Sequence, residues 1–278
     1  MIIPDISVDD LLRRYAVVLL DAYGVIVTSD GPLPGAAAFV ERLNEERKPY
    51  YIVTNDASRL PETAARRYKG FGLAIEPERF ITSGQLLVDY FRREGLAGVS
   101  CVVLGTADSR IYVERAGGRP VAADATFDAV VLCDESGFPF LEVVDGVLSG
   151  LVRAFDAGRT VRLVCANPDL VYPKREGFGI ASGSIALVLE AALDLRYPGR
   201  ARRFTHLGKP FPGLFEAARQ RSGTRDMVMV GDQLETDIRG ARSFGLDAVL
   251  VSTGVSHDVA GLPRELHPTW RLRGFSNG

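Results

Sequence analysis

The alternation of short apolar runs with helical patterns, at both ends of this 278-residue chain, constrains its fold more than any other feature of the sequence. Helical patterns occupy 35–47, the segment from Pro61, 212–221 and 234–245; proline suits a first helical turn. The apolar runs between them are AVVLL (16–20), YYIVT (50–54), MVMVG (227–231) and AVLVST (248–253). Strands that alternate with helices predict an α/β fold with a largely parallel sheet, to which WRLRGF would add an edge strand.

The middle of the chain, 83–202, carries a second set of strand and helix patterns. Its strand-like runs are CVVLG, AVVLC and VRLVC, and its helical patterns are LLVDYFRREG, EVVDGVLSGLVRAFDAG and SIALVLEAAL. That number of elements is enough for an α/β unit of its own. We therefore expect a discontinuous core, 1–82 and 203–278, that contains an inserted α/β domain at 83–202.

Charge and hydropathy exclude several classes of partner. Lys plus Arg number 33 and Asp plus Glu 35, so the net charge of −2 gives no reason to expect nucleic acid or an anionic membrane. No apolar run reaches the ~18 residues of a membrane span. The first residues, MIIPDISVDDLLRR, lack the basic and apolar regions of a signal peptide, so we expect a cytoplasmic protein.

Three cysteines, Cys101, Cys133 and Cys165, lie in apolar strand-like runs 32 residues apart. A metal site is the alternative for such regular spacing, but no CxxC pair or histidine cluster accompanies them. We interpret them as buried, reduced side chains.

Chemically active residue types follow several of the predicted strands, where functional groups of open α/β sheets gather. Each has an ordinary explanation when taken singly, as a turn former, a helix cap or a solvated side chain. Taken together and in this order, they indicate one site. They are Asp21 after AVVLL, Thr54 and Asn55 at the end of YYIVT, Lys209 in HLGKPFP, and Asp232 with Asp237 in VMVGDQLETDI.

With these motifs the chain resembles the haloacid dehalogenase superfamily over nearly its whole length. It is most similar to the NagD-like, p-nitrophenylphosphatase branch, in which a large α/β cap is inserted between the second and third motifs of a Rossmann-like parallel-sheet core. The similarity to that cap rests on FDAVVLCDE, CANPDLVYP (165–173), GFGIASGS and GKPFP. Asn167, Pro168 and Asp169 match the Asn-Pro-Asp motif of the branch.

The resemblance implies a role for each motif residue. Asp21 would be the nucleophile that takes the phosphoryl group, and Lys209 would hold both phosphate and Asp21. Mg²⁺ would be the cofactor, because two anions repel each other unless a cation neutralises them. Its ligands would be Asp21, Asp232 and the backbone carbonyl of Tyr23, with Asp237 supporting the site. The phosphate and the rest of the substrate would meet Thr54, Asn55, Lys209, Asn167 and Asp169.

Tyr23 departs from the family pattern. Family phosphatases carry Asp-x-Asp-Gly, and this chain has Asp21-Ala22-Tyr23-Gly24. The missing second aspartate normally protonates the leaving group and then activates water, help that is worth ~10²–10⁴-fold. A tyrosine with a pKa of about 10 can donate a proton but is a poor base near neutral pH. Asp56 in TNDASR is a candidate substitute, although we favour a helix-capping role for it.

The leading hypothesis is a Mg²⁺-dependent hydrolase of small phosphorylated metabolites that works through an aspartyl phosphate and is slowed by Tyr23. The first alternative is a catalytically weakened protein that binds a phosphometabolite or a partner. A dehalogenase is the less favoured alternative, since only about ten residues separate Val25 from the helix at Gly35 and leave no room for a helical cap there. His206 precedes the lysine motif, and an ordinary structural histidine is the favoured interpretation. A homodimer through the cap is implied by resemblance alone.

Overall fold

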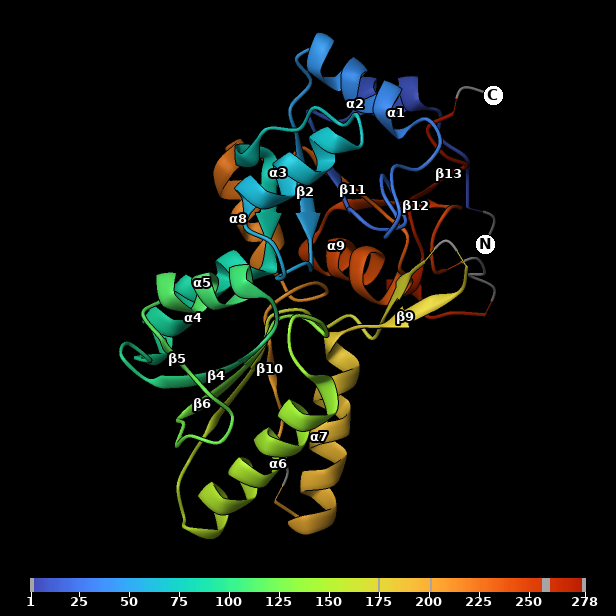
Figure 1. Ribbon diagram of the computed structural model, residues 1–278. Helices are drawn as coiled ribbons and strands as arrows, with labels where there is room; N and C mark the ends of the chain where they lie inside the picture. Colours follow the sequence, from blue (N-terminus) through green and yellow to red (C-terminus); the bar gives the residue numbers. More distant parts are fainter. Residues whose placement is uncertain (1–2, 175, 201, 257–260, 277–278) are drawn as a thin grey trace.

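The computed structural model describes residues 3–174, 176–200, 202–256 and 261–276, which are arranged around two parallel sheets (Figure 1). The first sheet uses strands from both ends of the sequence, drawn in blue and red, and the second uses the middle of the chain. In the first sheet the strand order is β13-β12-β11-β1-β2-β3. These strands are β1 (Val17–Leu20), β2 (Tyr50–Thr54), β3 (Phe80–Thr82), β11 (Met227–Gly231), β12 (Asp247–Val251) and β13 (Trp270–Leu272).

Strand β1 shows why helices cover both faces of the first sheet. All four of its residues are buried, and successive side chains of a strand point to opposite faces. Val18 and Leu20 pack on one face, and Val17 and Leu19 pack on the other. The first face is covered by α1 (Val8–Arg14), α2 (Ala36–Glu45) and α3 (Pro61–Gly70), and the second by α8 (Gly213–Ser222) and α9 (Arg239–Phe244).

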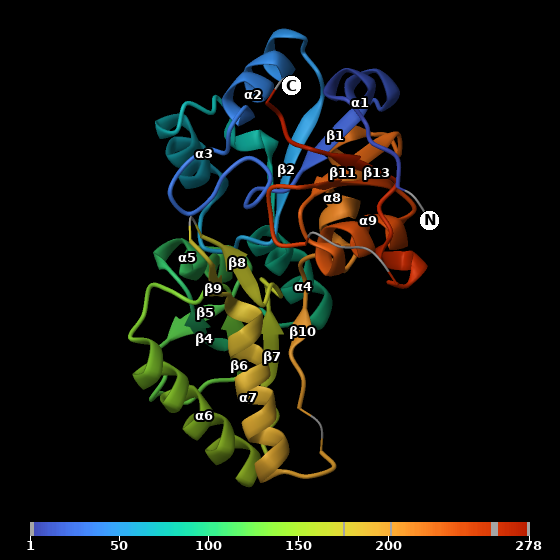
Figure 2. The same cartoon turned by 90° about the vertical axis from the view of Figure 1, so that its right-hand side faces the viewer.

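The second sheet has the order β10-β7-β6-β4-β5 and forms a separate lobe (Figure 2). Its strands are β4 (Ser100–Leu104), β5 (Arg119–Val121), β6 (Ala129–Leu132), β7 (Arg162–Cys165) and β10 (Thr205–His206). Helices α6 (Phe140–Asp156) and α7 (Ser182–Arg196) cover one face, and α4 (Leu86–Glu94) and α5 (Ala107–Arg115) cover the other. A short antiparallel hairpin, β8 (Val171–Pro173) and β9 (Phe178–Ile180), precedes α7.

Helix α5 joins the two lobes by hydrogen bonds to the loop that follows β2. The loop residues 57–60 offer three carbonyls and one amide to polar side chains of α5 and its N-cap. The bonds run from Ser109 Oγ to Ala57 O (2.8 Å), Thr106 Oγ1 to Ser58 O (2.5 Å), Tyr112 Oη to Arg59 O (2.7 Å) and Leu60 N to Asp108 Oδ2 (2.9 Å). The second lobe therefore holds a core loop that leads directly from the end of β2.

The predicted α/β fold with parallel sheets is confirmed, and WRLRGF does form an edge strand, β13. The predicted helix 234–245 is divided: residues 234–238 form a π-helical turn, η3 (Leu234–Ile238), and α9 follows it. Strand β10 lies just beyond residue 202 but pairs with β7 of the second sheet. The domain boundaries at 82 and 203 stay a prediction. None of the helices in the described residues is both long and apolar enough to span a membrane.

Candidate active site

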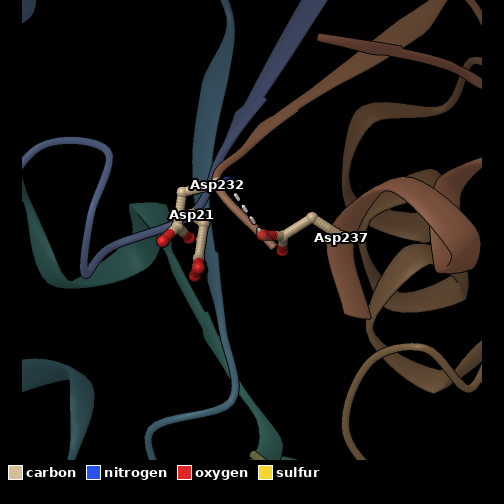
Figure 3. A group of neighbouring side chains, drawn as sticks. All are labelled: Asp21, Asp232 and Asp237. Atoms are coloured by element: carbon tan, nitrogen blue, oxygen red, sulfur yellow. Dashed lines mark hydrogen bonds between the residues drawn. The ribbon is translucent and has the colours of Figure 1, made fainter. Parts of the chain in front are cut away.

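Three carboxylates meet where the central strands of the first sheet end. Strands β1 and β11 are parallel neighbours, and the pairing of Leu20 with Val230 brings Asp21 and Asp232 to the same edge. Asp21 is 6% exposed, and Asp232 and Asp237 are fully buried. One carboxylate oxygen from each of the three lies within 4.8 Å of the others. Figure 3 shows the Asp21 and Asp232 carboxylates close together, with Asp237 directed toward them.

Lys209 connects this cluster from the loop after β10. Its Nζ lies 2.8 Å from Asp21 Oδ1 and 2.6 Å from Asp237 Oδ1, and it also donates to the carbonyl of Val53 at 2.9 Å. The lysine side chain is only 1% exposed. Burial on its own lowers the pKa of Lys209, but Asp21 and Asp237 raise it above its ordinary value. Lys209 is therefore a fixed positive charge that sets the position of the Asp21 carboxylate.

Glycines allow the chain to close tightly around Asp232. Gly24 adopts φ +80°, a conformation that side chains rarely take, and a Cβ there would overlap the Asp232 carboxylate. A Cβ at Gly254 would overlap the same carboxylate from the loop after β12. Two glycines from distant segments thus lie against the Asp232 carboxylate, and their backbones limit the directions that it can take.

Asp237 has little capacity left for a further ligand. Its Oδ1 is paired with Lys209, and its Oδ2 accepts the backbone N–H groups of Asp232 and Gln233, each at 3.1 Å. The π-helical turn η3 directs this side chain back toward the end of β11. Asp237 therefore positions Lys209 and the Asp232 backbone.

Asp232, in contrast, presents an unused oxygen. Its Oδ2 accepts the Val255 N–H at 2.8 Å, while its buried Oδ1 has no hydrogen-bond partner among the described residues. Buried polar atoms are rarely left unpaired, so this oxygen calls for a ligand. The Tyr23 carbonyl likewise accepts no hydrogen bond from a described residue. Together with Asp21 these are the oxygen donors that Mg²⁺ prefers, so the residues fit a divalent cation.

Burial and mutual repulsion make the acids of this cluster hard to ionise. Burial raises the pKa of the Asp21 carboxyl to about 7, and Asp237 adds to the rise while Lys209 opposes it. Burial and the same neighbouring carboxylates raise the pKa of Asp232 well above its ordinary value. Ionisation of both Asp21 and Asp232 is therefore costly without a further positive charge. A divalent cation would supply that charge.

Thr54 and Asn55, at the end of β2, have different surroundings. The Thr54 Oγ1 accepts the Asp56 N–H at 3.1 Å, and the hydroxyl proton of Thr54 has no acceptor among the described residues. Thr54 lines the pocket beside Asp21, where it can donate to a bound anion. Asn55 is outside that lining; its Nδ2 donates to Asp169 Oδ1 (2.8 Å), and its Oδ1 accepts from Lys209 N (2.7 Å). Asn55 therefore positions Asp169 and the Lys209 backbone, and its contact with phosphate stays a prediction.

The second lobe contributes Asn167 and Asp169 to the same pocket. Asn167 Oδ1 accepts the Asp169 N–H at 3.0 Å, which shapes the loop after β7. Burial raises the pKa of Asp169 to about 6, while Lys209 and the hydrogen bond from Asn55 lower it. The Asn55–Asp169 bond thus joins the two lobes at the edge of the carboxylate cluster.

The pocket that these residues line has a volume of about 240 Å³. Drug-sized ligands occupy roughly 300–1,000 Å³, so this pocket suits a smaller molecule. Its lining includes charged residues that sequence reasoning did not assign to the site: Arg59, Arg67, Asp134 and Glu135. Arg59 ends TNDASR, and Asp134 and Glu135 end FDAVVLCDE, so these motifs were the available signal for three of the four. Arg67 lies in no such motif.

Tyr23 lies in the pocket, and its ring is steeply inclined to that of Tyr172 (67° between the planes, ring centroids 6.4 Å apart). Its hydroxyl oxygen accepts N–H groups from Arg67 at 2.8 Å and from Arg59 at 3.5 Å. Burial raises the pKa of Tyr23, and the nearby Asp56 adds to the rise while the two arginines oppose it. The phenol therefore keeps its proton, which has no acceptor among the described residues and is free to be donated into the pocket.

The structure also shows the surroundings of Asp56, His206 and the three cysteines. The expected helix-capping role of Asp56 is wrong, because the N-cap of α3 is Leu60 and the Asp56 Oδ1 accepts instead from Ser58 N (2.6 Å) and Ser58 Oγ (2.5 Å). Its Oδ2 pairs with Arg59 at 3.1 Å. His206 is outside the pocket lining and stacks on Phe211, with ring centroids 6.0 Å apart. The three cysteines are buried and free.

Comparison with known proteins gives two family matches. Residues 18–119 match the haloacid dehalogenase-like hydrolase model, and residues 206–273 match a second model of HAD-hydrolase-like proteins. A dihydroxyacetone phosphatase from Corynebacterium glutamicum is 29% identical over 243 residues, which cover 87% of this chain and 82% of the relative.

Several solved structures are similar to this chain. A structure from Cytophaga hutchinsonii, described as a possible sugar phosphatase of the HAD superfamily, is 32% identical, with a TM-score of 0.84 and 99% of each chain covered. A glycerol phosphate phosphatase from Mycobacterium tuberculosis in complex with magnesium is 27% identical, with a TM-score of 0.78. The match covers 95% of this chain and 77% of that one. NagD from Escherichia coli is 26% identical, with a TM-score of 0.74. The match covers 94% of this chain and 97% of that one.

The fold, the strand-end carboxylates and these matches show that the chain belongs to the haloacid dehalogenase-like hydrolases. Within that superfamily the predicted NagD-like branch is confirmed, because NagD and a possible sugar phosphatase are among the similar solved structures. Residues 21–35, between β1 and α2, contain no helix, as we expected for a member without a cap at that position.

Proposed function

We propose that this hydrolase cleaves phosphate monoesters of small metabolites with the help of Mg²⁺, by way of an aspartyl phosphate on Asp21. The observation that carries the proposal is the unpaired, buried Oδ1 of Asp232 beside the Asp21–Lys209 pair. This arrangement combines a nucleophilic carboxylate, a fixed cation and a free oxygen ligand in one small pocket. The relatives that are named phosphatases support the same reaction class.

Asp21, Asp232 and the Tyr23 carbonyl would hold Mg²⁺, and Asp237 would support them. When bound, the ion would neutralise the carboxylate and the phosphate and so lower their mutual repulsion. The magnesium complex of the Mycobacterium tuberculosis relative supports this choice of cation. Asp232 contributes the free oxygen, and Asp237 keeps Lys209 in place.

The attack on phosphorus falls to Asp21. Lys209 holds Asp21 Oδ1 at 2.8 Å, which leaves Oδ2 free to form the bond to phosphorus. Thr54 donates its hydroxyl to a phosphoryl oxygen, and Lys209 adds positive charge on the same side. Groups of this kind, fixed before the reaction begins, stabilise the charge that develops in the transition state.

Tyr23 supplies the proton for the leaving oxygen. Its raised pKa keeps the phenol protonated, and the two arginine N–H groups on its oxygen leave the O–H directed elsewhere. The phenolate that this donation leaves takes a proton back from solvent, because the pKa of Tyr23 is raised. The second half of the reaction then lacks a good base, since neutral tyrosine cannot take a proton from the attacking water. We therefore infer that breakdown of the aspartyl phosphate limits turnover.

Phosphate release from a panel of esters, with Mg²⁺ and with a chelator, tests the proposal. The panel should hold dihydroxyacetone phosphate, glycerol 3-phosphate, hexose phosphates and p-nitrophenyl phosphate. We expect Mg²⁺-dependent release by the wild-type chain and none by Asp21→Asn. Equal release by both proteins would contradict the role of Asp21. Binding of these esters without release from any would favour the alternative, a phosphometabolite-binding protein. The homodimer and the cytoplasmic location stay predictions.

A further inference from the structure

Arg67 lines the pocket from the last turn of α3. A basic residue at that place commonly serves its own helix, by complementing the negative end of the dipole. This one reaches elsewhere: Nη1 donates to Tyr23 Oη at 2.8 Å, and Nη2 donates to the Ser29 carbonyl at 2.9 Å. Its guanidinium carbon lies 5.0 Å from the ring centroid of Phe71. The side chain is therefore held at the pocket wall by packing and by two hydrogen bonds.

The hydrogen-bonding capacity of this guanidinium is mostly unused. A guanidinium has five N–H donors, and Arg67 spends one from each of two nitrogens. Among the described residues, no acceptor takes the remaining three, and no carboxylate forms an ion pair with Arg67. Arg59 is different, because Asp56 Oδ2 neutralises it at 3.1 Å.

The charge around the Tyr23 hydroxyl is accordingly unbalanced. Two guanidinium groups contact its oxygen, and Asp56 is the carboxylate paired with one of them. The local excess is one positive charge, which belongs to Arg67. Asp134 and Glu135 line the pocket from the second lobe. In their ionised forms these carboxylates repel anions from their own wall and so favour the Arg67 side for any negative group.

We infer that Arg67 binds a second anionic group of the substrate, a carboxylate or a phosphate, on the leaving-group side of the ester. The inference rests on the proposed phosphatase function and narrows its substrates to phosphate monoesters that carry a further negative group. The leaving-group side follows from the bond between Arg67 and Tyr23, the proposed proton donor. A planar guanidinium with adjacent free N–H groups is the side chain best suited to such an anion.

Matched pairs of substrates test this inference. 3-Phosphoglycerate and glycerol 3-phosphate share a three-carbon skeleton and differ in a carboxylate; fructose 1,6-bisphosphate and fructose 1-phosphate differ in a phosphate. We expect the wild-type chain to have the higher kcat/KM on the anionic member of at least one pair, which identifies the anion. Arg67→Met should lower that kcat/KM roughly 10–100-fold, the scale of a lost charge-assisted hydrogen bond, with a much smaller loss on the other member.

Methionine keeps an apolar stem against Phe71, so the variant removes the charge with little change in packing. Arg66→Met is the matched control: this exposed neighbour on α3 donates to Thr63 at 3.3 Å and lies outside the pocket lining. It should leave both members of each pair unchanged. Equal losses on both members in Arg67→Met, or no preference in the wild type, would show that Arg67 only braces Tyr23 and Ser29 and would overturn the inference.

Binding separates this inference from the proposed reaction. Calorimetry with Asp21→Asn and Mg²⁺ measures the affinity for each substrate of a pair without turnover. A tighter complex with the anionic member, lost in Asp21→Asn/Arg67→Met, would support the inference even if wild type hydrolysed no ester. Hydrolysis by wild type without any preference in rate or affinity would leave the proposed function standing and would refute the role of Arg67.

Discussion

The ammonium nitrogen of Lys209 lies 2.6 Å from Oδ1 of Asp237, and both side chains are almost completely buried. The second oxygen of Asp237 is held by two backbone amides. Asp237 is therefore a support for the lysine, whereas Asp232 in the same GDQLETD segment has an oxygen without a partner among the described residues. Two acids that look equivalent in the sequence are thus expected to respond differently to substitution.

Asp232→Asn should abolish strong Mg²⁺ binding, because it removes a ligand oxygen and a neutralising charge together. Asp237→Asn should retain Mg²⁺ binding but lower turnover about 10–100-fold, as is typical for a residue that supports the groups around a metal. Isothermal calorimetry and phosphate release measure the two effects. Glu235→Gln, an exposed acid of the same turn, is the control. Loss of Mg²⁺ affinity that is equally severe in both aspartate variants would make Asp237 a direct ligand.

Tyr23→Asp should raise Mg²⁺-dependent phosphatase activity, since it restores a group that can both donate a proton and activate water. We expect a gain near ~10²-fold, the lower end of general acid/base effects, because the pocket is not shaped around that carboxylate. The gain in kcat/KM, which reports the first step, should be largest on alkyl phosphates and smallest on p-nitrophenyl phosphate, whose leaving group needs little protonation. An unchanged or lower rate in a folded, Mg²⁺-binding Tyr23→Asp protein would mean that another group already serves as base, with Asp56 the first to examine.

Tyr23→Phe separates proton donation from water activation. Removing the hydroxyl should slow the release of glycerol from glycerol 3-phosphate roughly 10²-fold. The release of p-nitrophenolate from p-nitrophenyl phosphate should slow much less. Pre-steady-state kinetics with both esters provide the measurement. If both esters slowed to the same extent, the hydroxyl would serve only to anchor Arg67, to which it is bonded at 2.8 Å.

Glu135 should make stability depend on pH. Burial and the neighbouring Asp134 raise its pKa from 4.5 to about 7; Asp56 adds to the rise and Arg59 opposes it. The folded state then binds more protons than the unfolded state, so this contribution to stability is complete below about pH 4.5 and is lost as the pH rises toward 7.

Thermal unfolding between those pH values, without added Mg²⁺, should therefore give a falling midpoint for wild type and a smaller fall for Glu135→Gln. Asp21 and Asp169, whose pKa values are raised to about 7 and about 6, continue to contribute to the fall in the variant. Glu142→Gln, an exposed glutamate of α6, should behave like wild type. Identical pH profiles for all three proteins would rule out the proposed environment of Glu135.

Tyr112→Phe should weaken the contact between α5 and the loop that follows β2, which joins the two lobes. Its hydroxyl donates to Arg59 O at 2.7 Å in a partly buried contact and lies 2.7 Å from Thr82 Oγ1 in a buried one. Loss of such a group typically destabilises by about 1–3 kcal/mol, since its former partners stay buried without a bond. Chemical denaturation measures the change, with Tyr197→Phe as a control on the more exposed hydroxyl of the residue that caps the C-terminus of α7. A free energy of unfolding equal to wild type would show that this bond does not hold the loop.

Much of the fold could be predicted because its signals are local. Strands β2 and β11 and the start of α3 at Pro61 lie where the apolar runs and the proline place them. Helix α5 was missed because its buried residues include Ser109 and Tyr112, so its apolar periodicity is weak. The two-residue strand β10 gives no periodic signal at all.

The site was predictable only in part, for a physical reason. Acids at the ends of neighbouring parallel strands must lie close together, so the pairing of Asp21 with Asp232 follows from strand order. Strand order does not determine which carboxylate oxygen stays without a partner, because the π-helical turn η3 sets the direction of the Asp237 side chain. The role of Arg67 depends on the rotation of α3 relative to the loop after β1, and no local pattern reports that rotation.

Trapping the phosphoenzyme tests the central claim most directly. Wild-type protein with Mg²⁺ and p-nitrophenyl phosphate should show a burst of p-nitrophenolate followed by slow turnover, because a neutral Tyr23 leaves water without a base. Rapid quenching and peptide mapping by mass spectrometry should then find a phosphoryl group on Asp21, and none in Asp21→Asn. Tyr23→Asp should shorten the life of that phosphoenzyme. Multiple turnovers with neither a burst nor a modified Asp21 would contradict the aspartyl-phosphate route.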